Sequence, residues 1–394
     1  MVSIDPDSLE NICECQRCLD AHKIKTLMKK NILCVVGTRP EAIKMAPVIL
    51  ALKQQPWAQV RVLATAQHRD LLDQVMAFFG IEPDMDLDIM QPNQALTTLT
   101  ARLLLELDKV LLAEKPDVVL AQGDTTTVMT VALACFYHRI PFGHVEAGLR
   151  TWDMQNPFPE EANRVIAGRL ARWHFAPTEG SRQNLLREGV QDADIVVTGN
   201  TVIDALLMTA SKELTLDIAL DSSKRLVLVT SHRRENFGEP FRHICQALKT
   251  LAERNSDIQI LYPVHPNPNV KDVAHAMLGE CRNIILCEPL DYAPFVAAMQ
   301  KAYLIISDSG GVQEEAPALG KPVLVLREET ERPEAVEMGV VKLVGSNVEL
   351  ILQAAQQMLD DPGAYASMAR GVSPYGDGLA SGRIVDVLRK HFLG

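Results

Sequence analysis

The sequence predicts an α/β protein built from two doubly wound, Rossmann-like domains that face each other across a cleft. Short apolar, β-branched runs alternate with amphipathic stretches of helical length, and this alternation is typical of βαβ units with parallel strands. The runs are almost continuously apolar, as expected of strands that are covered on both faces. The alternation restarts after residue 200, which indicates a second domain of the same kind.

The first domain is predicted to cover residues 28–198. Its expected strands are 32–37, 60–65, 117–124, 141–146, 174–177 and 194–199. Its expected helical stretches include 41–54, 70–79, 95–114, 125–138 and 160–171. Because helices of this length separate the strands, we expect crossover connections and a parallel sheet.

The second domain is predicted to cover residues 199–378. Its expected strands are 225–232, 258–265, 283–289, 303–310, 321–328 and 340–346. Residues 379–394 are expected to form a C-terminal helix that packs back on the first domain. Residues 1–27 precede the first expected strand and fit neither domain, so we interpret them as an N-terminal extension.

Composition excludes several classes of protein. The chain of 394 residues suits two to three domains of about 150 residues, and its 47% hydrophobic and 23% charged residues exclude wholesale disorder. The net charge of −11 argues against non-specific binding of nucleic acid or anionic membranes. There is no apolar run of about 18 residues and no apolar signal-peptide core. We therefore expect a cytoplasmic protein with neither nucleic acid nor membrane as a partner.

Cysteine usage argues for reduced thiols. Eight cysteines in a chain of this length form no disulfide framework. Cys13, Cys15 and Cys18 have a CxCxxC spacing that could hold a soft metal if a fourth ligand joined them, and His22 is near in sequence. No fourth ligand is evident otherwise, so we expect no metal.

The residues that follow each strand are the first place to look for a site, because ligands of open parallel sheets bind beyond the carboxyl ends of the strands. After the first strand, Gly37 permits a tight turn, and Arg39 and Lys44 lie at a helix start where an anion could bind. Such cations can equally be ordinary surface residues. Neither domain has a GxGxxG fingerprint after a strand, so we expect no nicotinamide dinucleotide and no other cofactor.

Three acids follow strands or begin helices at the same edge of the first domain. Asp124, Glu146 and Glu160 together exceed what capping requires, and they resemble acid/base equipment. Structural alternatives remain for each. Asp124 could be a helix N-cap, Glu146 could pair with Arg150, and Glu160 with Glu161 could match a helix dipole.

The second domain carries groups suited to a nucleotide diphosphate. His232 follows its first strand, and Ser309, Gly310 and Gly311 begin a helix whose backbone N–H groups could bind phosphate. Glu315 in that helix could accept ribose hydroxyls. These loops suggest a nucleotide in the cleft.

The motifs GTRPE, QGDTTT, HVEAGLRT, PFPEEANR, SHRRENFG, PVHPNP and SDSGGVQEEAPALGKPVLVLREETERPEA together resemble the non-hydrolysing UDP-N-acetylglucosamine 2-epimerase family over about residues 29–394. The resemblance implies a glycosyltransferase-B-like architecture, interconversion of UDP-GlcNAc and UDP-ManNAc without an added redox cofactor, a homodimer, and a supply of UDP-ManNAc for surface polysaccharides.

The resemblance also implies roles for individual residues. Those matching catalytic positions are Asp124, Glu146, Glu160 and His232. Those matching ligand-binding positions are Arg39, Lys44, Asp124, Glu146, His232, Phe295, Ser309, Gly310, Gly311, Glu315 and Arg332. Leu290 departs from the pattern, since some members carry Gln there, so a side-chain contact to uracil would be lost. A regulatory site for UDP-GlcNAc would include Gln67, Glu160, Arg233 and His265, with Asp70 replacing a Gln of a regulated member.

The chemistry of the reaction is consistent with these residues. C2 of the sugar is not next to a carbonyl, and oxidation at C3 would need the missing nicotinamide. Elimination of UDP to 2-acetamidoglucal, followed by re-addition, needs acids or bases near both sugar faces and stabilisation of the leaving diphosphate. A glycosyltransferase or a non-catalytic sugar-nucleotide sensor remain as alternatives.

Overall fold

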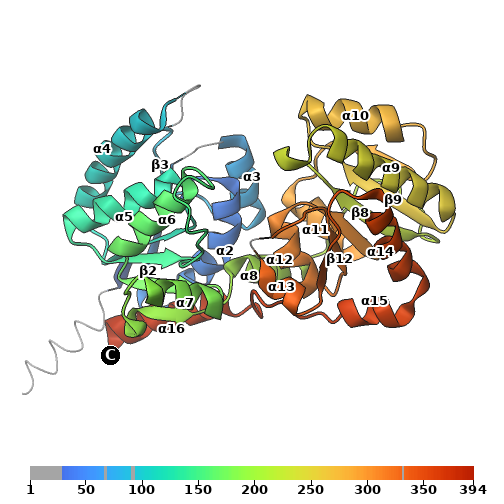
Figure 1. Ribbon diagram of the computed structural model, residues 1–394. Coiled ribbons are helices and arrows are strands. Elements are labelled where there is room, and N and C mark those ends of the chain that lie inside the picture. The colour runs from blue at the N-terminus through green and yellow to red at the C-terminus, as the bar shows by residue number, and fades with distance from the viewer. Residues whose placement is uncertain (1–28, 66–68, 90–93, 331) are drawn as a thin grey trace, which may run out of the picture. The chain divides into compact units, whose positions relative to one another are not determined.

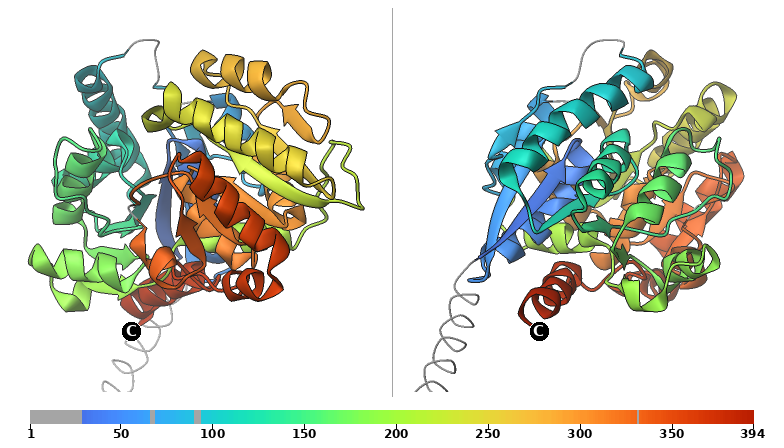
Figure 2. Two further views of the ribbon diagram at one scale, coloured as in Figure 1. Left: turned by 45° about the vertical axis from the view of Figure 1, so that its right-hand side comes forward. Right: turned by 90° about the vertical axis from the view of Figure 1, so that its left-hand side faces the viewer.

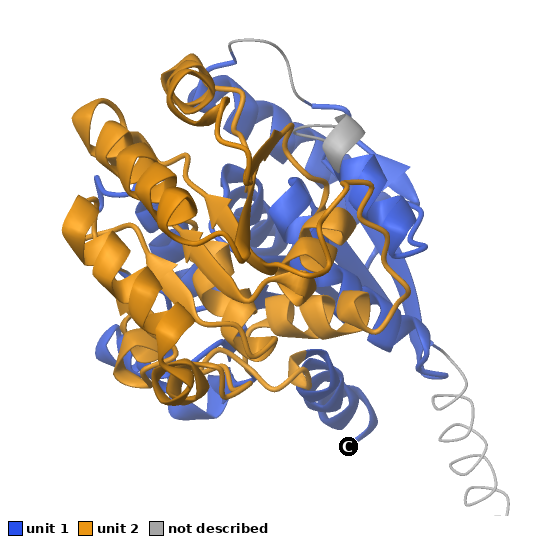
Figure 3. Ribbon diagram, turned by 90° about the vertical axis from the view of Figure 1, so that its right-hand side faces the viewer, with its two compact units in different colours: residues 1–198, 381–394 blue, residues 199–380 orange. Residues whose placement is uncertain are grey.

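The computed structural model describes residues 29–65, 69–89, 94–330 and 332–394. The chain divides into two compact units, one made of residues up to 198 with 381–394 and the other of residues 199–380 (Figure 3). Cys13, Cys15 and Cys18, with the rest of the expected extension, and Gln67 lie outside the described residues. Within the described ranges, no helix is long and apolar enough to cross a membrane.

Unit 1 contains a parallel sheet of seven strands in the order β3-β2-β1-β4-β5-β6-β7 (Figure 1). The strands are β1 (Lys30–Val36), β2 (Ala58–Ala64), β3 (Met85–Asp86), β4 (Val118–Gln122), β5 (Phe142–Val145), β6 (Trp173–Ala176) and β7 (Ile195–Val197). All six predicted strands are present. Strand β3 was not predicted, because two residues are too few to show a pattern.

The helices of unit 1 divide between the faces of this sheet according to the strand order. They are α2 (Arg39–Lys53), α3 (Arg69–Phe78), α4 (Leu96–Glu114), α5 (Thr126–His138), α6 (Glu160–Leu170), α7 (Glu179–Arg187) and α16 (Ala380–Leu393). The strand order reverses after β3, so right-handed crossovers place α2 and α3 on one face and α4 to α6 on the other. Leu103, Leu107 and Val131 on α4 and α5 accordingly form one buried cluster with Val35 and Val119 of the sheet. The teal helices α4 and α5 lie over one face of the blue strands (Figure 2).

Unit 2 contains a parallel sheet of six strands in the order β10-β9-β8-β11-β12-β13. The strands are β8 (Arg225–Thr230), β9 (Ile258–Pro263), β10 (Ile284–Cys287), β11 (Leu304–Ser307), β12 (Val323–Val325) and β13 (Val341–Leu343). Each lies within a predicted strand, and the prediction of two doubly wound α/β units is thereby confirmed.

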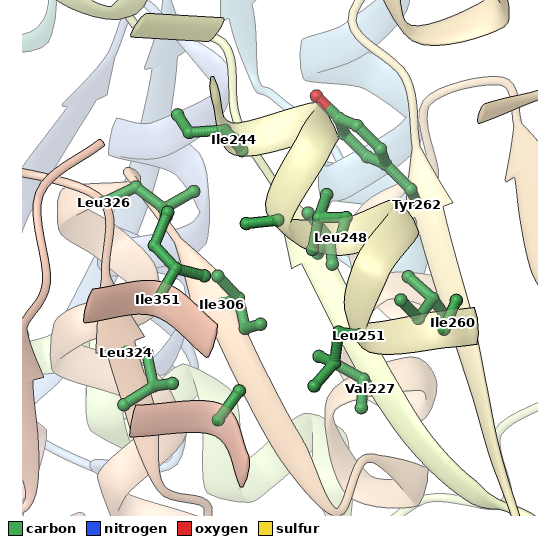
Figure 4. Packing of buried hydrophobic residues seen from close by; sticks show 14 of the residues in the cluster. Val227, Ile244, Leu248, Leu251, Ile260, Tyr262, Ile306, Leu324, Leu326 and Ile351 are labelled. Atoms are coloured by element: carbon green, nitrogen blue, oxygen red, sulfur yellow. The ribbon is translucent and has the colours of Figure 1, made fainter. Parts of the chain in front are cut away.

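Two apolar layers cover this second sheet. Its helices are α8 (Thr201–Ala210), α9 (Glu239–Arg254), α10 (Pro268–Leu278), α11 (Tyr292–Lys301), α12 (Gly310–Ala318), α13 (Pro333–Glu337), α14 (Val348–Asp360) and α15 (Pro362–Met368). Leu248 of α9 and Ile351 of α14 pack on Val227, Ile260 and Ile306 on one face (Figure 4). Residues of α8, α11 and α12 pack on the other face.

The strand order of each sheet reverses at one place, and that place identifies where a ligand can bind. In unit 1 the reversal lies between β1 and β4, and in unit 2 it lies between β8 and β11. The two connections that leave such a pair of strands run to opposite faces of the sheet, so a crevice opens beyond the strand ends.

Candidate functional site

The turn from β1 into α2 is held by hydrogen bonds to one buried carboxylate. Thr38 caps α2 and forms a capping box with Glu41, whose Oε2 accepts from the backbone N–H of Gly37 at 2.5 Å and of Thr38 at 3.1 Å. A Cβ atom on Gly37 would lie 2.6 Å from Thr65 Oγ1, so only glycine fits there. This turn positions Arg39 and Lys44 at the helix start. Burial raises the pKa of Glu41 to about 7.

Lys44 reaches across the crevice of unit 1 to Glu146. Its Nζ donates to Oε1 at 2.8 Å and to Oε2 at 2.7 Å, and the Glu146 side chain is 5% exposed. Gln122, at the end of β4, donates to the same carboxylate. Glu146 has φ +64°, a conformation that non-glycine residues rarely adopt and that is concentrated at functional sites. The β5 end therefore presents a carboxylate held by a cation and an amide.

Asp124 lies at the end of β4, on the other side of the reversal from Lys44. Its Oδ2 accepts from Nε of Arg164 at 2.9 Å, and its side chain is 29% exposed. The N-cap of α5 is Thr125, whose hydroxyl accepts from the N–H of Val128. The alternative in which Asp124 caps this helix is therefore wrong, and its carboxylate remains open to a ligand.

Buried His144 contacts the backbone of the turn that precedes Asp124. Its Nε2 is 2.7 Å from the carbonyl oxygen of Gly123, which has φ +92°. Burial lowers the pKa of His144 to about 4, so the ring is neutral near pH 7 and its Nε2–H donates to that oxygen. The imidazole thus fixes the turn from which Asp124 projects.

Glu160 and Glu161 begin α6 with different surroundings. Glu161 is buried, and its carboxylate accepts from the N–H groups of Thr151 and Trp152 and from Nη1 of Arg164. Among the described residues, none is shown to tie down the carboxylate of half-buried Glu160 in this way. Glu161 is therefore a structural anchor, whereas Glu160 can meet a ligand.

The alternative pairing of Glu146 with Arg150 is wrong. The Arg150 guanidinium is fully buried and forms a two-pronged pair with Glu188, through Nε at 2.7 Å and Nη2 at 2.8 Å. Its third nitrogen donates to the carbonyl of Leu149. Arg150 thus ties the end of α7 to the loop after β5, and the ion pair of Glu146 is with Lys44 instead.

In unit 2, the loop after β8 converges on one carboxylate after β11. Asp308 is 0% exposed, and its Oδ2 accepts from the Ser231 hydroxyl, the backbone N–H groups of His232 and Arg233, and the Asn236 amide, at 2.9–3.0 Å. Asn236 belongs to a short 3₁₀ turn, η2 (Arg234–Asn236). A hydrogen-bond network therefore ties the loop after β8, which includes His232, to Asp308 at the end of β11.

The His232 imidazole has a partner on each side. Its Nδ1 lies 3.5 Å from Asp308 Oδ1, and its ring stacks on exposed His265 with centroids 5.6 Å apart and planes at 16°. Burial lowers the pKa of His232, Asp308 opposes that shift, and His265 and Arg233 add to it. The His232 side chain is still 40% exposed, so a ligand can reach it.

The N-terminus of α12 has backbone N–H groups without a side-chain cap and a guanidinium close to them. Ser309 is its N-cap, but makes no side-chain bond to the free N–H groups of the first turn. A Cβ atom on Gly310 would lie 2.6 Å from Nη1 of Arg332, so glycine allows that guanidinium to approach the helix start. Arg332 also donates to Glu314 at 2.6 Å. Gly311 continues the same first turn.

The remaining predicted residues of unit 2 lie on the same side of the sheet. Glu315 is 7% exposed and accepts from the Tyr292 hydroxyl at 3.4 Å. Phe295 on α11 is partly buried and packs on the core with Leu290. A carboxylate on α12 and an aromatic ring on α11 thus lie on the helices that cover this face of the sheet.

Sequence reasoning missed four polar residues that complete these networks. Glu41, Gln122, Arg164 and Asp308 each contact a predicted residue or the loop that carries one. Gln122 and Asp308 lie at the ends of strands at the reversal points, so the rule that led to Asp124 could have found them. Glu41 and Arg164 lie within helices and show no such signal.

Comparison with known proteins identifies the class to which these features belong. Residues 50–389 match the family model described as UDP-N-acetylglucosamine 2-epimerase. The chain is 54% identical over 370 residues to the UDP-N-acetylglucosamine 2-epimerase of Escherichia coli (strain K12), covering 91% of this chain and 98% of that protein.

Two solved structures resemble the chain over nearly its whole length. The UDP-GlcNAc 2-epimerase from Neisseria meningitidis bound to UDP-GlcNAc aligns with a TM-score of 0.83 at 48% identity, covering 91% of this chain and all of that one. The Methanocaldococcus jannaschii UDP-GlcNAc 2-epimerase, in complex with UDP-GlcNAc and UDP, aligns with a TM-score of 0.76 at 36% identity, covering 91% and 99%.

Proposed function

This chain belongs to the UDP-N-acetylglucosamine 2-epimerase family, and we propose that it interconverts UDP-GlcNAc and UDP-ManNAc by eliminating UDP and adding it back. It is an enzyme of the isomerase class. The observation that carries the proposal is the pair of carboxylates Asp124 and Glu146, which follow the neighbouring strands β4 and β5 of unit 1. Lys44 binds Glu146, and Arg164 binds Asp124. Such groups can exchange a proton with a carbon acid.

The reaction balances without any added oxidant. A carboxylate removes the C2 proton, the C2–H electron pair forms the C1–C2 double bond, and the C1–O bond breaks with its pair leaving on UDP. The intermediate is 2-acetamidoglucal. In the return step a proton is delivered to the opposite face of C2, and the diphosphate oxygen attacks C1.

We assign the proton transfers to Asp124, Glu146 and Glu160. Lys44 holds the Glu146 carboxylate through both oxygens, which fixes its direction, and Arg164 holds Asp124 through Oδ2, with Nε at 2.9 Å and Nη2 at 2.8 Å. Within the part of the chain that the structure describes, the Glu160 carboxylate is not shown to have the contacts that anchor Glu161, which suits a group that meets substrate. Having several acids at one edge supplies proton donors and acceptors for both sugar faces.

We assign the nucleotide to unit 2. The leaving diphosphate would bind the α12 start at Ser309, Gly310 and Gly311, where Arg332 adds positive charge. His232 would stabilise or protonate the leaving phosphate. Glu315 would accept the ribose hydroxyls, and Phe295 matches a further ligand-binding position of the family. Arg39 completes the set of substrate-binding residues from unit 1.

Isotope exchange tests this mechanism. Reaction in D₂O should place deuterium at C2 of the product, because the proton lost to a carboxylate exchanges with solvent. Label in the C1 bridging oxygen should scramble into non-bridging phosphate positions, because the C1–O bond is broken in the intermediate. Deuterium incorporation without oxygen scrambling would exclude elimination of UDP.

A homodimer is proposed as the working form. Four large apolar side chains stand exposed on neighbouring helices of unit 1: Leu105 and Leu112 of α4 and Phe136 and Tyr137 of α5, each 58–68% exposed. A patch of this kind is typical of an interface. Leu112→Glu should shift the mass measured by light scattering from dimer to monomer, whereas exposed Leu350→Glu on unit 2 should not. A wild-type monomer would refute the dimer.

Regulation by UDP-GlcNAc is a further part of the proposal. By resemblance to the family, Gln67, Glu160, Arg233 and His265 match the second ligand site. Arg233 and His265 lie in the loops beside His232 in unit 2, and Gln67 lies outside the described residues. Reaction from pure UDP-ManNAc should then begin with a lag that trace UDP-GlcNAc abolishes, and Asp70→Gln should deepen this response because it removes a negative charge. Identical progress curves with and without UDP-GlcNAc in both proteins would contradict it. We expect the enzyme to act in the cytoplasm and to feed surface polysaccharide synthesis.

A further inference from the structure

Asp308 is a fully buried carboxylate beside the proposed site residue His232. Its exposure is 0%, and the bonds to its Oδ2 come from four donors within the stretch 231–236. Burying a carboxylate is costly unless its oxygens are satisfied. One oxygen is fully satisfied by the loop that carries His232.

The other oxygen has a different environment. Within the described residues, Asp308 Oδ1 is buried without a hydrogen-bond partner, and Nδ1 of the His232 imidazole lies 3.5 Å from it. An unsatisfied carboxylate oxygen aimed at an imidazole nitrogen favours a proton on that nitrogen. The ring's second nitrogen, Nε2, is then directed away from Asp308.

We propose that Asp308 is a positioning residue for His232: Oδ2 holds the loop, and Oδ1 receives the Nδ1–H of the imidazole, so that Nε2 is presented to the diphosphate. This inference rests on the proposed function, in which His232 meets the leaving phosphate. Its consequence is that Asp308 stabilises the protonated ring, whose Nε2–H is the donor that a departing phosphate needs.

The other charged and titratable groups around His232 disfavour the protonated imidazole. Arg233 neighbours it in the loop and His265 stacks on its face, and both lower the pKa of His232 in addition to burial. Asp308 is the group that raises it. Loss of the Asp308 charge should therefore move the titration of His232 to lower pH.

The substitution Asp308→Asn tests the roles of the two Asp308 oxygens separately. The Asn carbonyl can still accept from the loop donors, but its NH₂ then faces Nδ1, which must become an acceptor. The variant should change the neutral His232 ring from the Nδ1–H to the Nε2–H tautomer. Ser231→Ala is the matched control, because it removes one donor to Oδ2 and leaves Oδ1 and the ring in place.

The test is ¹⁵N NMR of histidine-labelled protein, with the His232 signals assigned from their loss in His232→Gln. We expect the Nδ1–H tautomer in the wild type and in Ser231→Ala, and the Nε2–H tautomer with a lower titration midpoint in Asp308→Asn. An Nε2–H tautomer in the wild type would overturn the proposal, whether or not Asp308→Asn folds.

Kinetics supply the second readout. Asp308→Asn should lower kcat by about 10²-fold with a smaller effect on KM, and should add less than about threefold to the loss in His232→Gln. A full additional loss in the His232→Gln background would show that Asp308 only anchors the loop. Near-normal turnover of His232→Gln would instead contradict the proposed function of His232, since the tautomer is measured without substrate.

Discussion

Lys44 donates to both carboxylate oxygens of Glu146, at 2.8 and 2.7 Å, although the two residues lie 102 positions apart in the chain. The pair connects the second turn of α2 with the residue that follows β5. Glu146 is therefore a buried carboxylate with a fixed direction, and its positive φ shows that the backbone is held in an unusual conformation to present it.

The first prediction concerns this pair. Glu146→Gln and Lys44→Met should each lower kcat by about 10²–10⁴-fold, and the double variant should be little worse than the poorer single variant, because the two groups act as a unit. Glu188→Gln is the control, since it breaks a comparable ion pair to Arg150 that is away from the strand reversal. It should lower the melting temperature and leave kcat within about threefold. Near-normal turnover of Glu146→Gln would remove this residue from the mechanism.

The second prediction separates Asp124 from its neighbour Thr125. Asp124→Asn should lower kcat by about 10²–10⁴-fold because it removes a proton acceptor. Thr125→Ala removes the N-cap of α5 instead, and should cost about 1 kcal/mol of stability measured by urea unfolding. If Asp124→Asn lost stability but kept its turnover, the carboxylate would be structural.

The third prediction separates two adjacent acids. Glu161 is 1% exposed and holds Thr151, Trp152 and Arg164, so Glu161→Gln should lower the melting temperature by several degrees. Glu160→Gln should leave the melting temperature nearly unchanged and lower kcat by about 10²–10⁴-fold. Thermal melts and initial rates on the same preparations decide this, and an active Glu160→Gln enzyme would contradict the assignment.

The fourth prediction is a pH dependence of stability that originates in Glu41. Its pKa is raised to about 7 in the folded protein by burial, so the folded state keeps a proton that the unfolded state releases near pH 4.5. Stability from this group is therefore present below about pH 4.5 and is lost as pH rises toward 7.

Glu41→Gln removes the loss of stability at rising pH. The amide oxygen can still accept from Gly37 and Thr38, but the side chain carries no charge. The free energy of unfolding of the variant, relative to wild type, should rise by on the order of 2–3 kcal/mol between pH 5 and pH 8. Parallel stability profiles for the two proteins, from urea unfolding at each pH, would refute a raised pKa at Glu41.

Much of the fold and the position of the site follow from the sequence alone. The strands at 32–37 and 117–124 could be recognised because continuous apolar runs reflect burial on both faces, and the reversal rule then directed attention to the residues after them. β3 could not be recognised, since Met85 and Asp86 carry no periodicity.

The partners of the site residues were harder to predict. Arg150 is four residues from Glu146 and was the natural candidate for an ion pair, yet the fold brings Lys44 to that carboxylate. The partners of Asp308 could not be predicted from the sequence either. Its place after a strand marks it as a site residue, but its four donors depend on how the 231–236 loop closes. Such contacts are set by tertiary packing and not by local pattern.

The most direct test of the central claim is to incubate the purified protein with UDP-GlcNAc alone and follow the sugar anomeric signals by ¹H NMR. We expect UDP-ManNAc to appear and to reach a constant ratio to UDP-GlcNAc, with no acceptor, nicotinamide or metal added. Accumulation of free ManNAc and UDP would instead identify a hydrolysing enzyme. An unchanged spectrum from folded protein would contradict epimerisation and favour a glycosyltransferase or a sugar-nucleotide sensor.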